Sequence, residues 1–295
     1  MNGIINVYKE KGFTSFDVVA KLRGILHIKK IGHTGTLDPD AEGVLPVCVG
    51  NATKACEYLS DHDKEYVVSF VLGIQTDTQD ISGTIINEVE ADVDEARLTE
   101  VIKSYVKTYD QIPPMYSAKK VNGKKLYELA RAGITVERKP SKVTIHSIEI
   151  MEIKLPRVVM KVHCSKGTYI RTLCDDIGMD LGCYATMETL LRTRVGEFDL
   201  EHAVKLSEIE ALAKQGRVSY CMMDTRLIFD DLRQTQIDES ESKALNNGNP
   251  LKLNNLDDKR NGEKICIYDA DGIFKAIYEY KADAELCKPW KMFIS

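Results

Sequence analysis

Apolar positions along the first two-thirds of the chain switch between the two-residue period of strands and the longer period of helices. Apolar runs predict strands at residues 4–7, 44–49 and 65–72. Thr14 or Ser15 is placed to cap a helix whose apolar positions are Phe16, Val19, Leu22 and Leu26. Asp94 opens another helix, with the stripe Leu98, Val101, Ile102 and Tyr105. These elements predict a broad sheet covered by helices.

The middle of the chain predicts a hairpin followed by a helix. β-branched runs at residues 143–153 and 158–164 flank Leu155-Pro156-Arg157, which is typical of a hairpin. The next helix has the apolar stripe Ile170, Leu173, Ile177 and Leu181 and ends at Gly182. Arg171 lies off this stripe in the first turn, where the helix dipole disfavours a cation. We therefore expect an anionic partner, and the sequence leaves open whether it is Asp38 or Asp175.

The last third of the chain predicts a short helix and a separate small domain. Ser207 starts a helix that carries Ile209 and Leu212, and residues 233–241 are polar enough for a linker. Strands at residues 264–268 and 272–280, separated by segments rich in Asn and Gly, fit a small β domain. We expect the chain to divide into residues 1–232 and residues 233–295.

Composition narrows the class of protein. The 295 residues are 43% hydrophobic and 29% charged, as in ordered globular chains, and contain no apolar run long enough to cross a bilayer. The first residues resemble neither a basic leader nor a signal core, so we expect a cytoplasmic protein. The eight cysteines form no C-x-x-C pair, the six histidines lack zinc-ligand spacing, and no nucleotide-binding glycine motif occurs. The sequence therefore predicts no metal and no cofactor.

Charge is unevenly distributed along the chain. The formal net charge is −5, which argues against a nucleic-acid partner. Between Met115 and Lys142, however, cations outnumber the two acidic residues Glu128 and Glu137; they are Lys119, Lys120, Lys124, Lys125, Arg131, Arg138, Lys139 and Lys142. The run includes the turn signal Asn122-Gly123. It fits either a solvated helix face or an arm that presents cations to phosphates.

One carboxylate stands in an unusual loop, Gly32-His33-Thr34-Gly35-Thr36-Leu37-Asp38-Pro39. Gly32 and Gly35 permit backbone angles closed to other residues, and Pro39 pushes Asp38 towards an extended conformation. Asp38 is therefore held in a defined direction. On these residues alone, an Asx turn or a helix cap is favoured over a catalytic role.

Several motifs in order resemble the TruB family of tRNA pseudouridine-55 synthases, from Gly3 to about Phe198 and more weakly beyond. The matching pieces are Lys9 to Ser15, the Asp38 loop with Gly43-Val44-Leu45-Pro46, Asp63-Lys64-Glu65-Tyr66, Pro113-Pro114-Met115-Tyr116-Ser117-Ala118, Leu126-Tyr127-Glu128-Leu129-Ala130-Arg131, and Ser165-Lys166-Gly167-Thr168-Tyr169-Ile170-Arg171. The resemblance implies an α+β fold with a large mixed, mostly antiparallel sheet and flanking helices. It also implies an inserted RNA-binding thumb at about residues 113–139 and a small C-terminal β domain resembling PUA.

Position matching within the family implies roles for individual residues. Asp38 would be the essential catalytic carboxylate, and Arg171 would pair with it. The remaining substrate contacts would be His33, Tyr66, Lys166, Tyr169 and Leu190, with His33 wedged into the RNA loop, Tyr66 stacked on the target base, and Lys166 and Leu190 lining the pocket. The thumb residues Lys119, Lys120, Lys124, Lys125 and Arg131 would bind the RNA backbone. Burial would raise the pKa of Asp38 and Arg171 would lower it, which we expect to leave the acid charged at neutral pH.

The activity implied by the resemblance is the isomerisation of uridine 55 in the T loop of tRNA. The base would be flipped out, its N-glycosidic bond broken, and the base rejoined through carbon, without cofactor, metal or guide RNA. The acceptor stem would contact the C-terminal domain, and we expect a monomer. The order of the chemical steps and the role of Tyr66, as base or stacker, stay open. Two alternatives are a guide-dependent synthase subunit and an RNA-binding tRNA folding factor.

Overall fold

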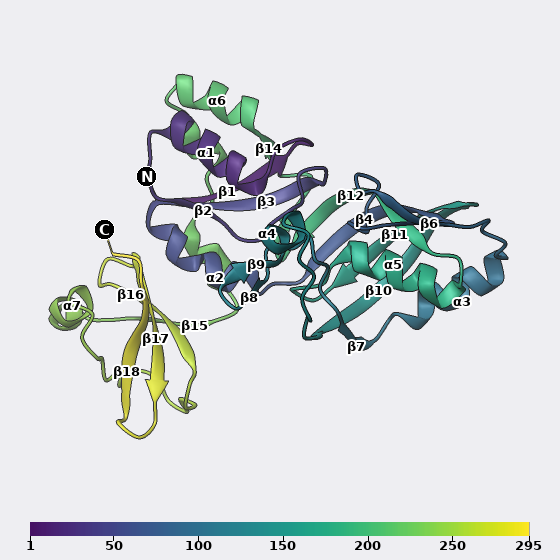
Figure 1. The fold of residues 1–295 in the computed structure, drawn as a ribbon. Helices are drawn as coiled ribbons and strands as arrows, with labels where there is room; N and C mark the ends of the chain where they lie inside the picture. Colours follow the sequence, from purple (N-terminus) through teal and green to yellow (C-terminus); the bar gives the residue numbers. More distant parts are fainter. Residues whose placement is uncertain (295) are drawn as a thin grey trace.

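The computed structural model describes residues 1–294 and is built on one large mixed sheet (Figure 1). The strands of this sheet are β1 (Gly3–Lys9), β2 (Ile31–His33), β3 (Glu42–Val49), β4 (Lys64–Leu72), β7 (Thr108–Gln111), β10 (Ser141–Lys154), β11 (Arg157–Cys164), β12 (Ala185–Val195), β13 (Phe198–Asp199) and β14 (Val204–Lys205). Their order is β14-β1-β3-β12-β4-β11-β10-β7, with β2 beside β3 and β13 beside β12. Two pairs, β1/β14 and β3/β12, are parallel and the others antiparallel, which confirms the predicted mostly antiparallel sheet.

Helices cover this sheet at both of its ends. Near β1, helix α1 (Ser15–Leu26) and helix α6 (Leu206–Lys214) pack together over Ile5 and Val7. At the other end, α3 (Glu95–Ser104) and α5 (Ile170–Leu181) bury their apolar stripes over β4 and β11. Helix α5 ends at Gly182 with a left-handed φ of 76°, as predicted. No helix among residues 1–294 is both long and apolar enough to cross a membrane.

The predicted stripe of α1 is partly wrong. Thr14 caps the helix and forms a capping box with Asp17, as its position suggested. That start directs Ser15, Val18, Val19 and Leu22 into the core, whereas 64% of Phe16 is exposed. The spacing of Phe16 matches the helical period of the other apolar residues. Spacing alone, however, does not determine whether a residue in the first turn faces the core or the solvent.

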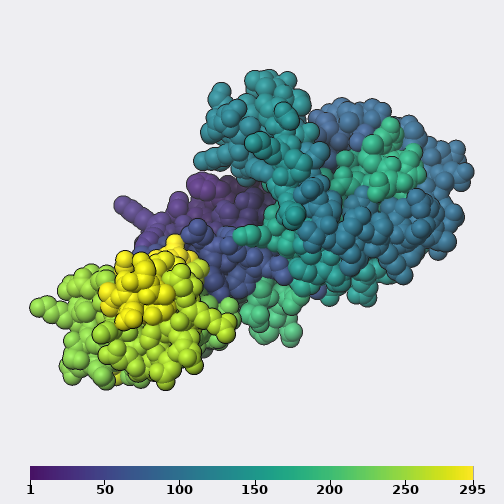
Figure 2. All heavy atoms as spheres, turned by 90° about the horizontal axis from the view of Figure 1, so that it is seen from below, coloured from purple at the N-terminus to yellow at the C-terminus, as the bar shows by residue number. Residues whose placement is uncertain are grey.

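The C-terminal residues form a second, four-stranded sheet, visible as the yellow-green lobe in Figure 2. Its strands are β15 (Arg233–Gln236), β16 (Lys264–Tyr268), β17 (Phe274–Lys281) and β18 (Leu286–Met292), and it carries helix α7 (Glu239–Asn246). The linker predicted at 233–241 is therefore wrong. β15 pairs in parallel with β16 and buries only Thr235, so an edge strand with exposed polar side chains has the composition of a linker.

The two sheets share an apolar cluster. Phe229 lies at its centre and packs with Cys266 and Ile277 of the C-terminal sheet and with Cys48 and Leu59 of the main body. The segments around it are η1 (Gly50–Ala55), α2 (Cys56–Ser60), η2 (Val218–Cys221) and η3 (Thr225–Phe229). The C-terminal lobe is therefore fixed on the body by side-chain packing.

The basic segment at residues 113–139 is inserted between β7 and β10 and forms the teal projection in Figure 2. It contains a short ribbon of β8 (Lys120–Val121) and β9 (Lys124–Lys125), followed by α4 (Leu126–Arg131). Asn122 and Gly123 close the ribbon with φ values of 52° and 82°, which confirms the predicted Asn-Gly turn. We keep the name thumb for residues 113–139. A second ribbon, β5 (Ile74–Thr76) with β6 (Ile85–Glu88), leaves the sheet after β4.

Candidate active site

A cavity of about 1020 Å³ lies where the Asp38 loop, the turn between β5 and β6, and the thumb meet. Its wall includes the expected catalytic residue Asp38 and three of the residues expected to bind substrate, namely His33, Arg171 and Leu190. Lys125 and Arg131 reach it from the thumb. The structure thus brings together residues that are up to 157 positions apart in the sequence. Cavities of this size hold a nucleotide or a drug-sized ligand.

The loop between β2 and β3 holds Asp38 through contacts to its backbone. The amide of Ala41 donates to the carbonyl of Asp38 at 3.1 Å, which closes a turn. The hydroxyl of Ser15 accepts from the amide of Leu37 at 2.9 Å. From β1, the Nζ of Lys9 donates to the carbonyls of Pro39 at 3.0 Å and Ala41 at 2.6 Å. These bonds fix the direction of the Asp38 side chain from both sides.

Lys9 and Arg192 were not identified as functional residues from the sequence, although strand alternation carries a signal for Lys9. Lys9 follows Ile5 and Val7 on the buried face of β1 and is fully buried itself. Burial lowers the pKa of its ammonium group to about 8, against the opposing charges of Asp38 and Glu42. The equally buried Arg192 of β12 donates to the carbonyls of Val44 at 2.7 Å and Gly35 at 3.2 Å. Two buried cations therefore brace the loop.

The expected special backbone angles are not found at Gly32 and Gly35, because neither residue has a positive φ. The requirement for glycine falls on Gly43 at the start of β3, where φ is 106°. A Cβ atom there would lie 2.2 Å from the carbonyl oxygen of Arg192. The close pairing of β3 with β12 beneath the Asp38 loop therefore depends on Gly43.

Arg171 pairs with Asp38 and not with Asp175. Its Nε lies 2.9 Å from Oδ2 of Asp38, and its Nη2 donates to Oδ1 at 3.2 Å. Asp175 instead accepts bonds from Gln75 and Gln79. Such a two-point contact between guanidinium and carboxylate fixes orientation as well as charge. The alternative left open by the sequence is thereby decided.

The guanidinium of Arg171 is itself held by two further segments. It donates to the carbonyls of Thr78 at 2.8 Å and Tyr116 at 2.9 Å, and Asp80 Oδ2 lies 3.5 Å from Nη1. Thr78 and Asp80 belong to the turn between β5 and β6, and Tyr116 belongs to the thumb. The unfavourable position of an arginine in the first turn of α5 is thus offset by two carboxylates and two carbonyls.

Burial raises the pKa of Asp38 above its usual value, and the neighbouring Asp80 adds to this effect. The charge and the hydrogen bond of Arg171 act in the opposite direction, as does the charge of Lys9. About 38% of the Asp38 side chain remains open to the cavity. The carboxylate is therefore partly exposed and lines the space that a ligand would fill.

Tyr66 of β4 lies in the core beneath the loop and does not line the cavity. It is 8% exposed and belongs to the same apolar cluster as Leu37, Ala41 and Leu190. Burial raises the pKa of the phenol, and the guanidinium of Arg192 beside it opposes this shift. A phenol with a raised pKa is protonated at neutral pH, so this environment does not favour Tyr66 as a general base.

Two other expected substrate contacts also lie away from the cavity wall. The side chain of Lys166 is 56% exposed, pairs with Asp61 at 2.7 Å and is not among the residues that line the cavity. Tyr169 precedes α5 as its N-cap residue, and its backbone makes two hydrogen bonds with the side chain of Gln111. His33 does line the cavity, and its buried Nδ1 has no hydrogen-bond partner among the described residues. Sequence spacing does not predict the ion pair between Lys166 and Asp61.

The thumb cations divide into two groups. Lys119 donates to the hydroxyl of Ser141 at 2.6 Å at the base of the thumb, whereas Lys120 and Lys124 are exposed on the ribbon. Lys125 and Arg131 lie against the ring of Tyr127 beside the cavity. The thumb therefore presents cations both along its outer edge and towards Asp38.

Comparisons with known protein families agree with this fold and site. The family model described as TruB family pseudouridylate synthase (N terminal domain) matches residues 23–170, and the tRNA pseudouridylate synthase B C-terminal domain model matches residues 171–227. These two matches define the chain as an isomerase of the pseudouridylate synthase class. The chain belongs to the TruB family.

Full-length relatives support this membership. A protein from Lachnoclostridium phytofermentans named tRNA pseudouridine synthase B is 51% identical over all of this chain and all of its own length. Proteins of the same name from Alkaliphilus oremlandii and Limosilactobacillus reuteri are 45% and 42% identical, over 91% and 99% of this chain and 90% and 99% of their own lengths.

Solved structures show the same fold. A crystal structure of a Cbf5-Nop10-Gar1 complex contains a chain with a TM-score of 0.74 and 26% identity, covering 99% of this chain and 85% of that one. A chain in the archaeal box H/ACA sRNP Nop10-Cbf5 complex has a TM-score of 0.72 and 25% identity, with 99% and 86% coverage. Since coverage includes the C-terminal lobe, the two-sheet arrangement is common to these chains.

Proposed function

We propose that this protein converts uridine 55 in the T loop of tRNA to pseudouridine, with Asp38 as the catalytic carboxylate. The observation that carries the proposal is the Asp38–Arg171 pair, placed at the cavity with the carboxylate facing its interior. The relatives named tRNA pseudouridine synthase B, matched over the full chain, support tRNA as the substrate. We further propose that the protein acts as a cytoplasmic monomer, without guide RNA or cofactor.

The site must support three changes in the substrate. The N1–C1′ bond breaks, the base turns, and a C5–C1′ bond forms, with the proton of C5 replaced by one on N1, so that substrate and product contain the same atoms. Asp38 is placed either to attack the sugar or the base or to stabilise positive charge at C1′ as the bond breaks. Arg171 keeps the carboxylate oriented, and the cavity holds the base while it turns.

The uridine must first leave its stack, which costs a few kcal/mol. The cavity wall offers the apolar surface of Leu190 and the side chain of His33, which can substitute for the stacking of the base within the RNA. The thumb residues Lys119, Lys120, Lys124, Lys125 and Arg131 are proposed to bind RNA phosphates around the opening. The C-terminal lobe, residues 233–294, is proposed to contact the acceptor stem.

The test uses an unmodified tRNA transcript and the purified full-length chain without other RNA or metal. Wild-type protein should form one pseudouridine at position 55, and Asp38→Asn should lower turnover by at least about 10³-fold while binding tRNA as tightly as the wild type. Asp40→Asn is the matched control, because it removes a neighbouring carboxylate of the same loop and should leave turnover unchanged. Full turnover in Asp38→Asn would exclude Asp38 from the mechanism.

A guide-dependent function is the second candidate, because one similar solved structure is that of an archaeal box H/ACA sRNP Nop10-Cbf5 complex. It predicts that the wild-type chain alone leaves the transcript unmodified. The same assay therefore separates the two functions, since only the first predicts modification by a single protein.

A further inference from the structure

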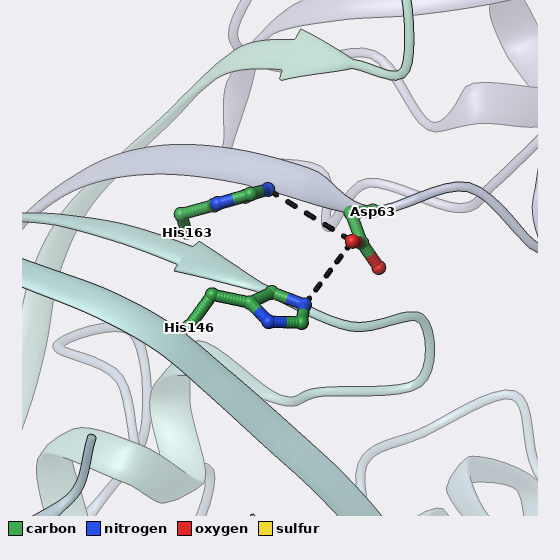
Figure 3. A group of neighbouring side chains, drawn as sticks. All are labelled: Asp63, His146 and His163. Carbon is green, nitrogen blue, oxygen red and sulfur yellow. Dashed lines mark ion pairs between the residues drawn. The ribbon is translucent and has the colours of Figure 1, made fainter. Parts of the chain in front are cut away.

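Three side chains of types that can bind a metal lie together on the main sheet, and none of them lines the cavity of the proposed active site (Figure 3). His146 comes from β10, His163 from β11, and Asp63 immediately precedes β4. Oδ2 of Asp63 lies 3.1 Å from Nε2 of His146 and 4.0 Å from Nε2 of His163. One potential ligand atom from each residue lies within 4.8 Å of the other two.

The strand pairing explains why these side chains share one face of the sheet. In β11, Val162 and Cys164 are buried, so His163 points to the opposite face. Its partner strand β10 carries a bulge, since Ile145 pairs with Cys164 but Ser147 pairs with His163. His146 is the additional residue of that bulge. Bulges redirect a side chain, and here the result is two imidazole rings with centroids 4.8 Å apart.

The neighbouring acid, Glu65, is already occupied by other side chains. It accepts from Thr193 at 2.9 Å, pairs with Lys161 at 3.2 Å, and lies 3.9 Å from Arg194. The ion pairs of Asp63 within residues 1–294 are with His146 and His163 alone.

We propose that Asp63, His146 and His163 form a binding site for a divalent transition-metal ion of the Zn²⁺ class. Two imidazoles and one carboxylate favour such ions over Mg²⁺ or Ca²⁺, which prefer oxygen ligands. Tetrahedral zinc with bonds of about 2.0–2.1 Å places neighbouring ligand atoms about 3.3 Å apart. The distances of 3.1 and 4.0 Å lie on either side of this value, and all three ligand atoms lie within 4.8 Å of one another, so side-chain rotations would have to bring them to one ion. A water molecule would take the fourth position.

The prediction of no metal rested on the lack of closely spaced ligand residues in the sequence. His146 and His163 are separated by the whole β10–β11 hairpin, and Asp63 lies in a distant segment. The bound ion would join three segments of the sheet. Because it binds the folded state, it should also stabilise the protein against unfolding.

The experiment uses the full-length chain without an affinity tag and Zn²⁺ as the probe. Equilibrium dialysis should show one Zn²⁺ per chain, and His146→Gln, His163→Gln and Asp63→Asn should each weaken binding at least about tenfold. The matched control is His202→Gln, because His202 and Asp199 form an exposed pair, 2.8 Å apart, that has no third potential ligand among residues 1–294. This control should bind Zn²⁺ as the wild type does.

Two further readouts guard against misfolding and against binding to cysteine. Saturating Zn²⁺ should raise the Tm of the wild type and not that of the double variant His146→Gln/His163→Gln. Bound Co²⁺ should give visible absorption typical of nitrogen and oxygen ligands, without a thiolate charge-transfer band. Absence of Zn²⁺ binding, equal affinity in the three ligand variants, or a thiolate band would overturn the proposal.

Discussion

Arg171 and Asp38 are 133 residues apart and meet in a two-point ion pair, with Nε 2.9 Å from Oδ2 and Nη2 3.2 Å from Oδ1. The same guanidinium binds the carbonyls of Thr78 and Tyr116. One side chain therefore joins the Asp38 loop, the turn after β5 and the thumb. The position of the carboxylate depends on all three segments.

Replacing Arg171 with Lys should lower kcat for pseudouridine formation by about 10²-fold. Lysine keeps the charge, but it cannot contact the carboxylate twice and also bind both carbonyls. Arg171 is the largest influence that lowers the pKa of Asp38, so the variant should raise that pKa. The acidic limb of the pH profile of the single-turnover rate constant should then move to higher pH. Arg97→Lys, at an exposed pair with Glu100, is the control, and an unmoved limb would contradict the role of the Asp38–Arg171 pair.

Replacing Asp80 with Asn should have the opposite effect on pH dependence. Asp80 lies 3.5 Å from Arg171 and raises the pKa of Asp38. Removing its charge should lower the pKa of Asp38, so that activity persists to lower pH than in the wild type. The pH profile of single-turnover rates measures this shift.

Asp77→Asn is the control for distortion of the turn, because Asp77 accepts from the amide of Thr84 and does not contact Arg171. A shift of the same size in both variants would mean that the shape of the turn, not the charge of Asp80, is responsible.

Gly43→Ala should reduce the free energy of unfolding by about 3 kcal/mol or more, as measured by urea denaturation. The substitution adds a Cβ atom 2.2 Å from the carbonyl of Arg192 at a φ of 106°. Gly216→Ala separates the two causes, because Gly216 has a φ of 68° with no heavy atom within 4 Å of a Cβ. That control should cost only about 1 kcal/mol, and equal losses would show that the clash is relieved.

The double variant Lys120→Gln/Lys124→Gln should bind tRNA more weakly and with a smaller salt dependence. Removing one lysine–phosphate ion pair should reduce the slope of log K against log salt by about 0.7–0.9. Filter binding over a series of salt concentrations measures the slope. Lys214→Gln is the control, because this exposed lysine lies on α6 and pairs with Glu210. An unchanged slope in the double variant would mean that the outer edge of the thumb does not touch RNA.

Local patterns predicted the elements whose apolar faces are continuous. The stripe from Leu98 to Tyr105, the hairpin around Pro156 and the end of α5 at Gly182 are each encoded by nearby residues. Motif order also predicted the Asp38–Arg171 pair. Short-range patterning failed where the deciding contact came from elsewhere, as for the polar strand β15, which pairs with a strand about 30 residues later.

The same limit applies to the site. Matching the motifs of the family to this sequence identified Lys166 but not its ion-pair partner Asp61. It did not identify Arg192, whose hydrogen bonds to the carbonyls of Gly35 and Val44 form only in the folded sheet. The bulge that turns His146 towards His163 depends on strand register, which local sequence does not specify.

The apolar cluster around Phe229 also affects how the molecule can be divided. Phe229 and Leu59 belong to the body, while Cys266 and Ile277 come from the C-terminal sheet, and all four are buried together. Cutting the chain at residue 232 would expose apolar side chains of this cluster on both fragments. The main body and the C-terminal lobe should therefore unfold in a single cooperative transition. The C-terminal lobe should not fold as an independent domain.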